Sequence, residues 1–188
     1  LIIINVLIFM ATALLPKAGN TIMEYCALSL GTPFFHVYQF ITYMFLHVNF
    51  EHIFFNMFAL WMFGRTLEYE LGQKRFLTYY MVCGIGAALI QYLTALAFGE
   101  FPLVLVGASG AVMGLLLAFG VLHPNAVIML LIPPIPMKAK WFVVIYGVIE
   151  LFLGWRGVGN VAHFAHVGGM LWGFLLLQWW KQRGIIRF

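Results

Sequence analysis

Long apolar segments recur along the whole chain, and the polar stretches between them are short. Six of them are bounded by charges, proline or glycine, at about 1–15, 40–63, 76–98, 105–122, 141–155 and 161–180. Only 9% of the residues are charged and 64% are hydrophobic, a composition that does not suit a water-soluble domain. Lipid offers backbone groups no hydrogen-bonding partner, so each segment should be helical. We therefore predict an all-α, polytopic membrane bundle of six transmembrane helices.

The rest of the chain is too short for a separate soluble domain. Residues 1–188 are predicted to form a single membrane domain, whose amino end we expect to be trimmed because it starts at Leu1 without a methionine. Residues 16–39 mix polar and apolar side chains and are predicted to be an interfacial loop. Cys26 and Cys83 lack metal or redox spacing and are expected to pack. No nucleic-acid partner is expected.

Basic residues give the predicted orientation. Eight of them fall on one side of the threading, namely Arg65, Lys74, Arg75, Lys138, Lys140, Lys181, Arg183 and Arg187. The other two, Lys17 and Arg156, fall on the opposite side. The more basic side is predicted to be cytoplasmic. The expected location is the cell inner (plasma) membrane, and segments 40–63, 105–122 and 161–180 should all run inward.

Placing a polar side chain inside a membrane segment costs free energy, so such residues are candidates for a function. The set comprises His47, His52, Asn56, Ser109, Glu150, His163 and His166. At a rise of about 1.5 Å per residue, His52, Ser109 and His166 lie at one depth, roughly 20 Å above the inner boundary. Asn56 lies one turn deeper than His52 on the same helix face, whereas His163 lies higher. Depth therefore favours His166 as the partner of Ser109.

Ser109 stands between glycines in the stretch VGASGAVMG. The residues from Ser109 to Leu122 are too few to cross a bilayer, so the helix should begin inside the membrane, after a loop that dips in. Its free N–H groups and the positive end of its dipole would favour an oxyanion.

Two segments carry small residues at intervals of four. One has Gly110, Gly114 and Ala118, and the other has Ala165, Gly169 and Gly173. Such stripes let two backbones approach closely. Because both segments run in the same direction, pairing the stripes in register brings Ser109 beside His166. A hydroxyl beside a neutral imidazole can act as a nucleophile with its general base.

The simplest chemistry is therefore a Ser109/His166 dyad. The chain has no Asp, and Glu150 is a less favoured candidate to orient His166. His52 and Asn56 could donate hydrogen bonds to an oxyanion, together with the backbone N–H groups at Ser109 and Gly110.

Structural roles compete with these assignments. His52 and Asn56 could instead form interhelical hydrogen bonds, and a serine among glycines could simply pack between helices. His47 and His163 are expected to be structural. No cofactor or catalytic metal is predicted, because HVNFEH lacks the HExxH spacing and no further carboxylate is well placed.

Three motifs stand out in the chain, namely HVNFEHIFFN at 47–56, GASG at 107–110 and AHVGGMLWG at 165–173. Together they resemble the motifs of the rhomboid intramembrane serine proteases of the bacterial, six-span type. The resemblance covers essentially the whole chain. It implies Ser109 as nucleophile and His166 as base, with His52 and Asn56 near the oxyanion hole. It also implies cleavage of transmembrane protein substrates near their outer ends, within the lipid bilayer.

The sequence departs from the family pattern at two places. Tyr38-Gln39 stands in the first loop where many bacterial members carry Trp-Arg. Met113 stands where relatives often place an aromatic ring against the catalytic histidine, a space that methionine can fill. Neither departure removes a reacting group.

A catalytically silent membrane protein that binds client helices, as a chaperone or scaffold, is the alternative of a different class. A transporter fits less well, because paired broken helices in two related halves are not evident. The natural substrate and the oligomeric state are left open. The active site is expected to open toward the outer side.

Overall fold

The computed structural model describes residues 1–129, 134–157 and 162–188. Within these ranges, eight α-helices form most of the structure, in agreement with the predicted helical class. They are α1 (Ile2–Leu14), α2 (Pro16–Cys26), α3 (Gln39–Thr42), α4 (Phe50–Leu71), α5 (Gln73–Phe98), α6 (Ser109–Leu122), α7 (Ala139–Arg156) and α8 (His163–Gln182). A short 3-10 helix, Tyr43–Phe45, follows α3.

One described helix, α5, is both long and apolar enough to cross a membrane, with a mean hydropathy of 1.8. Helices α1 and α6 are apolar but shorter. The prediction of six spans therefore stays a prediction. Residue 161, where the last predicted segment begins, lies outside the described ranges.

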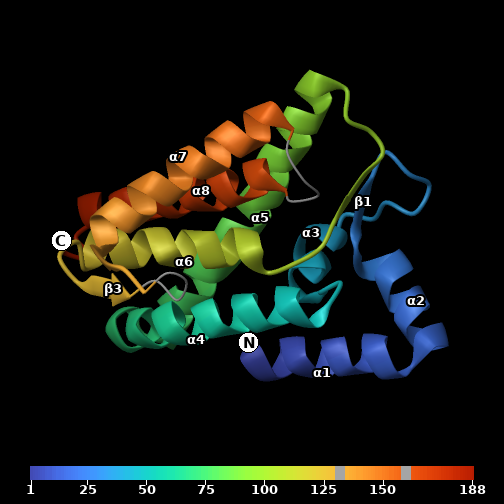
Figure 1. The fold of residues 1–188 in the computed structure, drawn as a ribbon, viewed down its shortest axis with the longest axis horizontal. Coiled ribbons are helices and arrows are strands. Elements are labelled where there is room, and N and C mark those ends of the chain that lie inside the picture. The colour runs from blue at the N-terminus through green and yellow to red at the C-terminus, as the bar shows by residue number, and fades with distance from the viewer. Residues whose placement is uncertain (130–133, 158–161) are drawn as a thin grey trace.

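Helix α6 lies in the middle of the bundle, where it contacts α4, α5, α7 and α8 (Figure 1). Helices α4, α6 and α8 run in the same direction, so their amino ends lie at one end of the molecule (Figure 1). Strand β1 and helix α3 lie toward that end as well (Figure 1). The candidate residues on the three parallel helices are thereby gathered at one end.

The segment predicted as one helix over 40–63 is broken. Helix α4 begins only at Phe50, where the Asn49 side chain caps it by accepting a hydrogen bond of 2.8 Å from the His52 backbone N–H. At its other end the helix continues to Leu71. His47 therefore precedes the helix that carries His52 and is not part of it.

The region 16–39 is more regular than the predicted loop. Its first part forms α2, which begins with Pro16, a residue whose fixed φ suits a helix start. Strand β1 (Leu28–Leu30) then pairs antiparallel with β2 (Leu103–Leu105). This small sheet, which was not expected from the sequence, connects the first loop to the segment before Ser109. A second pair, β3 (Val127–Met129) with β4 (Pro136–Lys138), precedes α7.

Gln39 organises the first loop. Its side chain is fully buried and makes four hydrogen bonds to the backbone. Oε1 accepts from the N–H groups of Ser29 and His36, while Nε2 donates to the carbonyls of Tyr25 and Phe34. An uncharged amide thus anchors the loop, because it can donate and accept at once.

Glycines bring α6 and α8 into backbone contact. A Cβ placed on Gly169 would clash with the carbonyl group of Gly110. A Cβ on Gly114 would come 3.0 Å from the carbonyl oxygen of Gly169. Gly173 faces α5 instead, where a side chain would meet the Tyr79 hydroxyl. The small residues therefore make room for α5 as well as for the α6–α8 contact.

Candidate active site

Ser109 and His166 lie within hydrogen-bonding distance of each other. Nε2 of His166 is 2.8 Å from Oγ of Ser109. Ser109 is the first residue of α6, and His166 lies in the first turn of α8. Ser109 is partly exposed while His166 is buried. Ser109 is therefore accessible in part, whereas His166 is enclosed by the surrounding protein.

The loop that presents Ser109 is fixed by its backbone. The Gly107 N–H donates to the Tyr43 carbonyl at 2.9 Å, and Gly107 has a φ of 119°, which favours glycine. A Cβ at this position would lie 2.6 Å from Nε2 of His52 and 3.8 Å from Oγ of Ser109. Glycine therefore lets the His52 ring approach the loop beside the serine hydroxyl.

The two predicted oxyanion residues of α4 have different surroundings. His52 is partly exposed, and its ring packs edge-on against His47, with centroids 4.9 Å apart. Asn56 is buried, and its Nδ2 donates to the backbone carbonyl of His52 at 2.9 Å. An amide nitrogen carries two N–H groups, so one donor is left beyond the bond within α4. The N–H of Gly110 lies in the first turn of α6, where helix N–H groups lack acceptors within the helix.

A buried carboxylate lies behind the histidine. Oε2 of Glu150, on α7, is 2.7 Å from Nδ1 of His163 and 3.1 Å from Nδ1 of His166. The first contact is a hydrogen bond. Nδ1 of His166 has no well-aligned hydrogen bond among the described residues, although Glu150 is close to it. His163, expected to be structural, thus contacts the same carboxylate as His166.

Glu150, His163 and His166 also offer a set of metal-ligating atoms, all within 4.8 Å of one another. Two imidazoles and a carboxylate would suit zinc. Ligands about 2.0–2.1 Å from a tetrahedral zinc ion lie roughly 3.3–3.4 Å apart. The 2.7 Å contact between Glu150 and His163 is shorter and has the length of a hydrogen bond. The arrangement is therefore that of a hydrogen-bonded polar group.

Two residues that were not among the predicted candidates support the site. Oε1 of Gln91, on α5, accepts a 3.0 Å hydrogen bond from the Ala165 N–H in the first turn of α8. The Tyr43 hydroxyl donates to the Gly84 carbonyl at 2.6 Å. Gln91 carried a usable signal, because an amide inside an apolar segment needs a partner. Tyr43 carried none, since aromatic residues are frequent throughout this chain.

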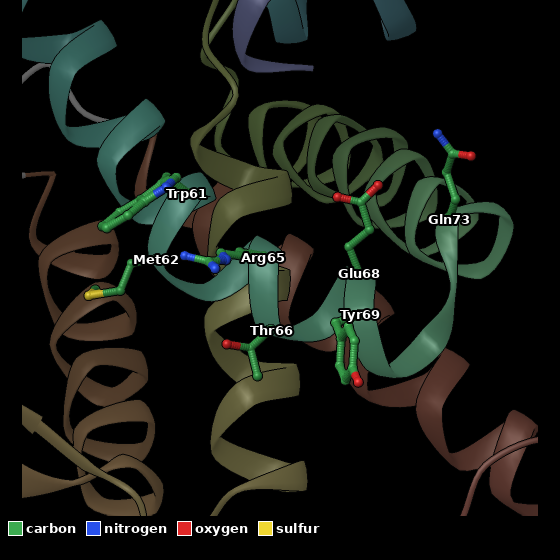
Figure 2. A pocket seen from close by; sticks show the side chains of 7 residues that line it. All are labelled: Trp61, Met62, Arg65, Thr66, Glu68, Tyr69 and Gln73. Atoms are coloured by element: carbon green, nitrogen blue, oxygen red, sulfur yellow. The ribbon is translucent and has the colours of Figure 1, made fainter.

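A hollow of about 850 Å³ lies away from these residues (Figure 2). Its lining comes from the second half of α4 and the start of α5, and consists of Trp61, Met62, Arg65, Thr66, Glu68, Tyr69 and Gln73. His52 and Asn56 belong to the opposite half of α4. None of the predicted site residues lines this hollow.

Curated proteins from eukaryotes are similar to this chain. Rhomboid protein 1, mitochondrial, from Saccharomyces cerevisiae is 34% identical over 146 residues, which cover 75% of this chain and 41% of the relative. Presenilin-associated rhomboid-like protein A, mitochondrial, from Danio rerio is 32% identical over 154 residues, covering 77% and 39%. Rhomboid-like protein 11, chloroplastic, from Arabidopsis thaliana is 41% identical over 78 residues, covering 42% and 26%. The chain thus spans about two fifths or less of their length.

These relatives overturn the predicted location. The plasma membrane was expected from the distribution of basic residues, which gives the sidedness of a membrane protein but does not identify the membrane. The yeast and zebrafish relatives are both mitochondrial proteins, so the plasma-membrane assignment was wrong. The finer assignment to the bacterial type stays a prediction.

The family assignment rests on a match over most of the chain. The Rhomboid domain model matches residues 35–181, a range that includes Ser109 and His166. The match also covers His52, Asn56 and the glycines between α6 and α8. The chain belongs to the rhomboid family.

Proposed function

We propose that this chain is an intramembrane serine endopeptidase that cleaves transmembrane segments of other membrane proteins. The observation that carries the proposal is the 2.8 Å distance between Oγ of Ser109 and Nε2 of His166. Membership of the rhomboid family supports the same reaction class.

The proposed reaction begins with proton transfer from the Ser109 hydroxyl to Nε2 of His166. Oγ attacks the scissile carbonyl carbon, and the carbonyl oxygen becomes an oxyanion. The imidazolium then gives its proton to the departing amide nitrogen, which leaves an acyl group on Ser109. Water, deprotonated by the same imidazole, hydrolyses this ester and restores the hydroxyl.

The oxyanion is proposed to lie between the start of α6 and the start of α4. The N–H of Gly110, the ring of His52 and the remaining donor of Asn56 are the candidate hydrogen-bond donors. The close approach of His52 to the Gly107 loop supports this assignment. Removing one such donor from a serine protease costs roughly 10²–10³ in kcat.

The proposed substrate is a membrane helix that unwinds near the site, because a regular helix hides its carbonyl groups in its own hydrogen bonds. Helix-breaking residues near the cleaved bond would favour unwinding. The names of the yeast and zebrafish relatives support a mitochondrial membrane as the location.

The test uses purified protein reconstituted with a single-span substrate. Wild type should cleave the substrate, and Ser109→Ala should abolish cleavage. His166→Ala should be similarly inactive, whereas His163→Ala, which keeps the contact between Ser109 and His166, should lose less activity and retain a substantial part of it. Equal cleavage by wild type and Ser109→Ala would remove the proposed nucleophile.

Fluorophosphonate labelling separates the protease from a silent helix-binding protein. A protease should give a stoichiometric adduct on Ser109, because the base activates its hydroxyl. A folded wild-type protein that neither reacts with the probe nor cleaves the substrate would favour the silent binder.

A further inference from the structure

The Glu150 carboxyl group is buried between two helices in a way that needs explanation. Only 4% of the residue is exposed, and its Oε2 lies close to Nδ1 of both His163 and His166. A buried carboxylate is costly unless it is hydrogen-bonded. Tyr146, one turn earlier on α7, adds a further polar interaction with the same carboxyl group.

The two nitrogens of the His166 ring face different partners. Nε2 faces the Ser109 hydroxyl at 2.8 Å, and Nδ1 faces Glu150 Oε2 at 3.1 Å. A neutral imidazole carries its proton on one nitrogen, and the nitrogen without it can accept. An ionised carboxylate can only accept, so a negative Glu150 favours the proton on Nδ1. That tautomer leaves Nε2 free to take the proton of the serine.

We infer that Glu150 is a positioning residue, which holds His166 in the Nδ1–H tautomer with Nε2 directed at Ser109, and that His163 fixes the carboxylate in this place. The inference rests on the proposed protease function and adds a third member to the Ser/His pair. Glu150 keeps its negative charge throughout and takes no proton. It also stabilises the positive imidazolium that forms when Ser109 loses its proton, as the acid of a Ser-His-Asp triad does.

The geometry distinguishes the roles of the two histidines. His163 makes the shorter contact with Glu150, 2.7 Å, with the alignment of a hydrogen bond. The contact from His166 is longer and less aligned, as its ring also faces Ser109. His163 therefore acts on the carboxylate, and the carboxylate acts on His166.

The first experiment compares Glu150→Gln with wild type in the reconstituted cleavage assay. Glutamine has nearly the same shape but no charge. We expect kcat to fall by about 10- to 1000-fold, less than the roughly 10⁴-fold loss in the corresponding Asp variant of a serine protease, because the contact is imperfectly aligned. KM should stay within about twofold of wild type, since substrate contacts are unchanged. Unchanged kcat in a folded variant would overturn the inference.

The matched control is Glu100→Gln, which removes the same charge from an exposed position. This variant should keep wild-type kcat and KM. A Glu100→Gln loss as large as that of Glu150→Gln would show a general effect of charge and would count against the positioning role. Thermal unfolding of both variants reports whether either change acts through stability.

A second measurement needs no substitution at Glu150. Nitrogen-15 NMR of histidine-labelled wild type reports which ring nitrogen of His166 is protonated, with the signal assigned by its loss in His166→Ala. We expect protonated Nδ1 and bare Nε2 in the neutral ring. The opposite tautomer would overturn the inference even if Glu150→Gln failed to fold.

The outcomes separate this inference from the proposed function. Stoichiometric labelling of wild-type Ser109 by a fluorophosphonate supports the protease, whatever Glu150 does. Labelling of Glu150→Gln at the wild-type rate would then reject the positioning role alone. Absence of labelling and cleavage in folded wild type would reject both.

Discussion

Helices α6 and α7 are both strongly apolar, yet they occupy opposite environments. In α6, 8 of the 14 residues are buried, and these include three glycines. In α7, 3 of the 18 residues are buried, namely Ala139, Val143 and Glu150. Helix α6 lies inside the bundle, whereas α7 lies on its outside (Figure 1). Hydropathy alone does not separate a helix surrounded by protein from one with a large free surface, whereas small residues at fixed spacing do.

The two helices also contribute differently to the proposed chemistry. Helix α6 holds Ser109 rigidly, because α4, α5, α7 and α8 all contact it. Helix α7 contributes one buried charged residue, Glu150, while most of its other residues are partly or fully exposed. The comparison predicts that substitutions in and around α6 lower the free energy of unfolding strongly. Most substitutions in α7 should change it little.

The largest expected effect comes from Gly169→Ala. The added Cβ would clash with the Gly110 carbonyl, which is backbone and cannot move away easily. We expect a loss of at least about 2 kcal/mol in the free energy of unfolding, measured in detergent micelles, together with loss of cleavage. A near-neutral result would show that α6 and α8 do not need this close approach.

The control for that substitution is Gly147→Ala in α7. Its Cβ would lie 3.2 Å from the terminal methyl of Met170, a flexible side chain that can shift. Replacing glycine by alanine inside a helix gains roughly 0.5–1 kcal/mol, which should offset the crowding. A loss comparable to that of Gly169→Ala would contradict the proposed difference between the two helices.

A smaller effect is expected from Tyr79→Phe. The buried Tyr79 hydroxyl donates to the Gly114 carbonyl of α6 at 2.9 Å. Its removal should cost about 0.5–1.5 kcal/mol of unfolding free energy, the usual net value of such a bond. The comparison variant is Tyr92→Phe, because Tyr92 is only partly buried. Equal losses in the two variants would argue against a specific contribution from the bond to α6.

The smallest effect is expected on the outer face of α7. Val148 is 60% exposed, so Val148→Ala should change the free energy of unfolding by less than about 0.5 kcal/mol. The matched substitution Val112→Ala, at a position of α6 that is 2% exposed, should be clearly more destabilising. Thermal unfolding of the two variants side by side measures the difference. A larger loss from Val148→Ala would mean that another protein surface covers α7.

Much of the site could be predicted from local pattern. The short run from Ser109 to Leu122 predicted a helix that starts at Ser109, and α6 begins at that residue. The small residues predicted a close approach of two helices, and Gly169 lies against Gly110. These features are local or periodic, so a single sequence carries them.

The features that could not be predicted depend on how a helix is rotated about its own axis and on the pairing of segments that are far apart in the chain. The depth of a residue along a helix does not give the direction of its side chain. Glu150 was therefore a less favoured candidate to orient His166, although its Oε2 lies 3.1 Å from Nδ1 of His166. The pairing of β1 with β2 joins segments far apart in the chain, with no strong strand pattern in either. The break before Phe50 was hidden because apolar residues continue on both sides of the Asn49 cap.

The backbone contact between Gly110 and Gly169 can form only after both α6 and α8 have been synthesised. Ribosomes synthesise α6 before α8, so an incomplete chain contains Ser109 but not yet His166. On the proposed mechanism such an intermediate is harmless to other proteins in its membrane, since nothing activates the hydroxyl. The chain would become able to cleave substrates when α8 packs against α6, because this packing places His166 beside Ser109.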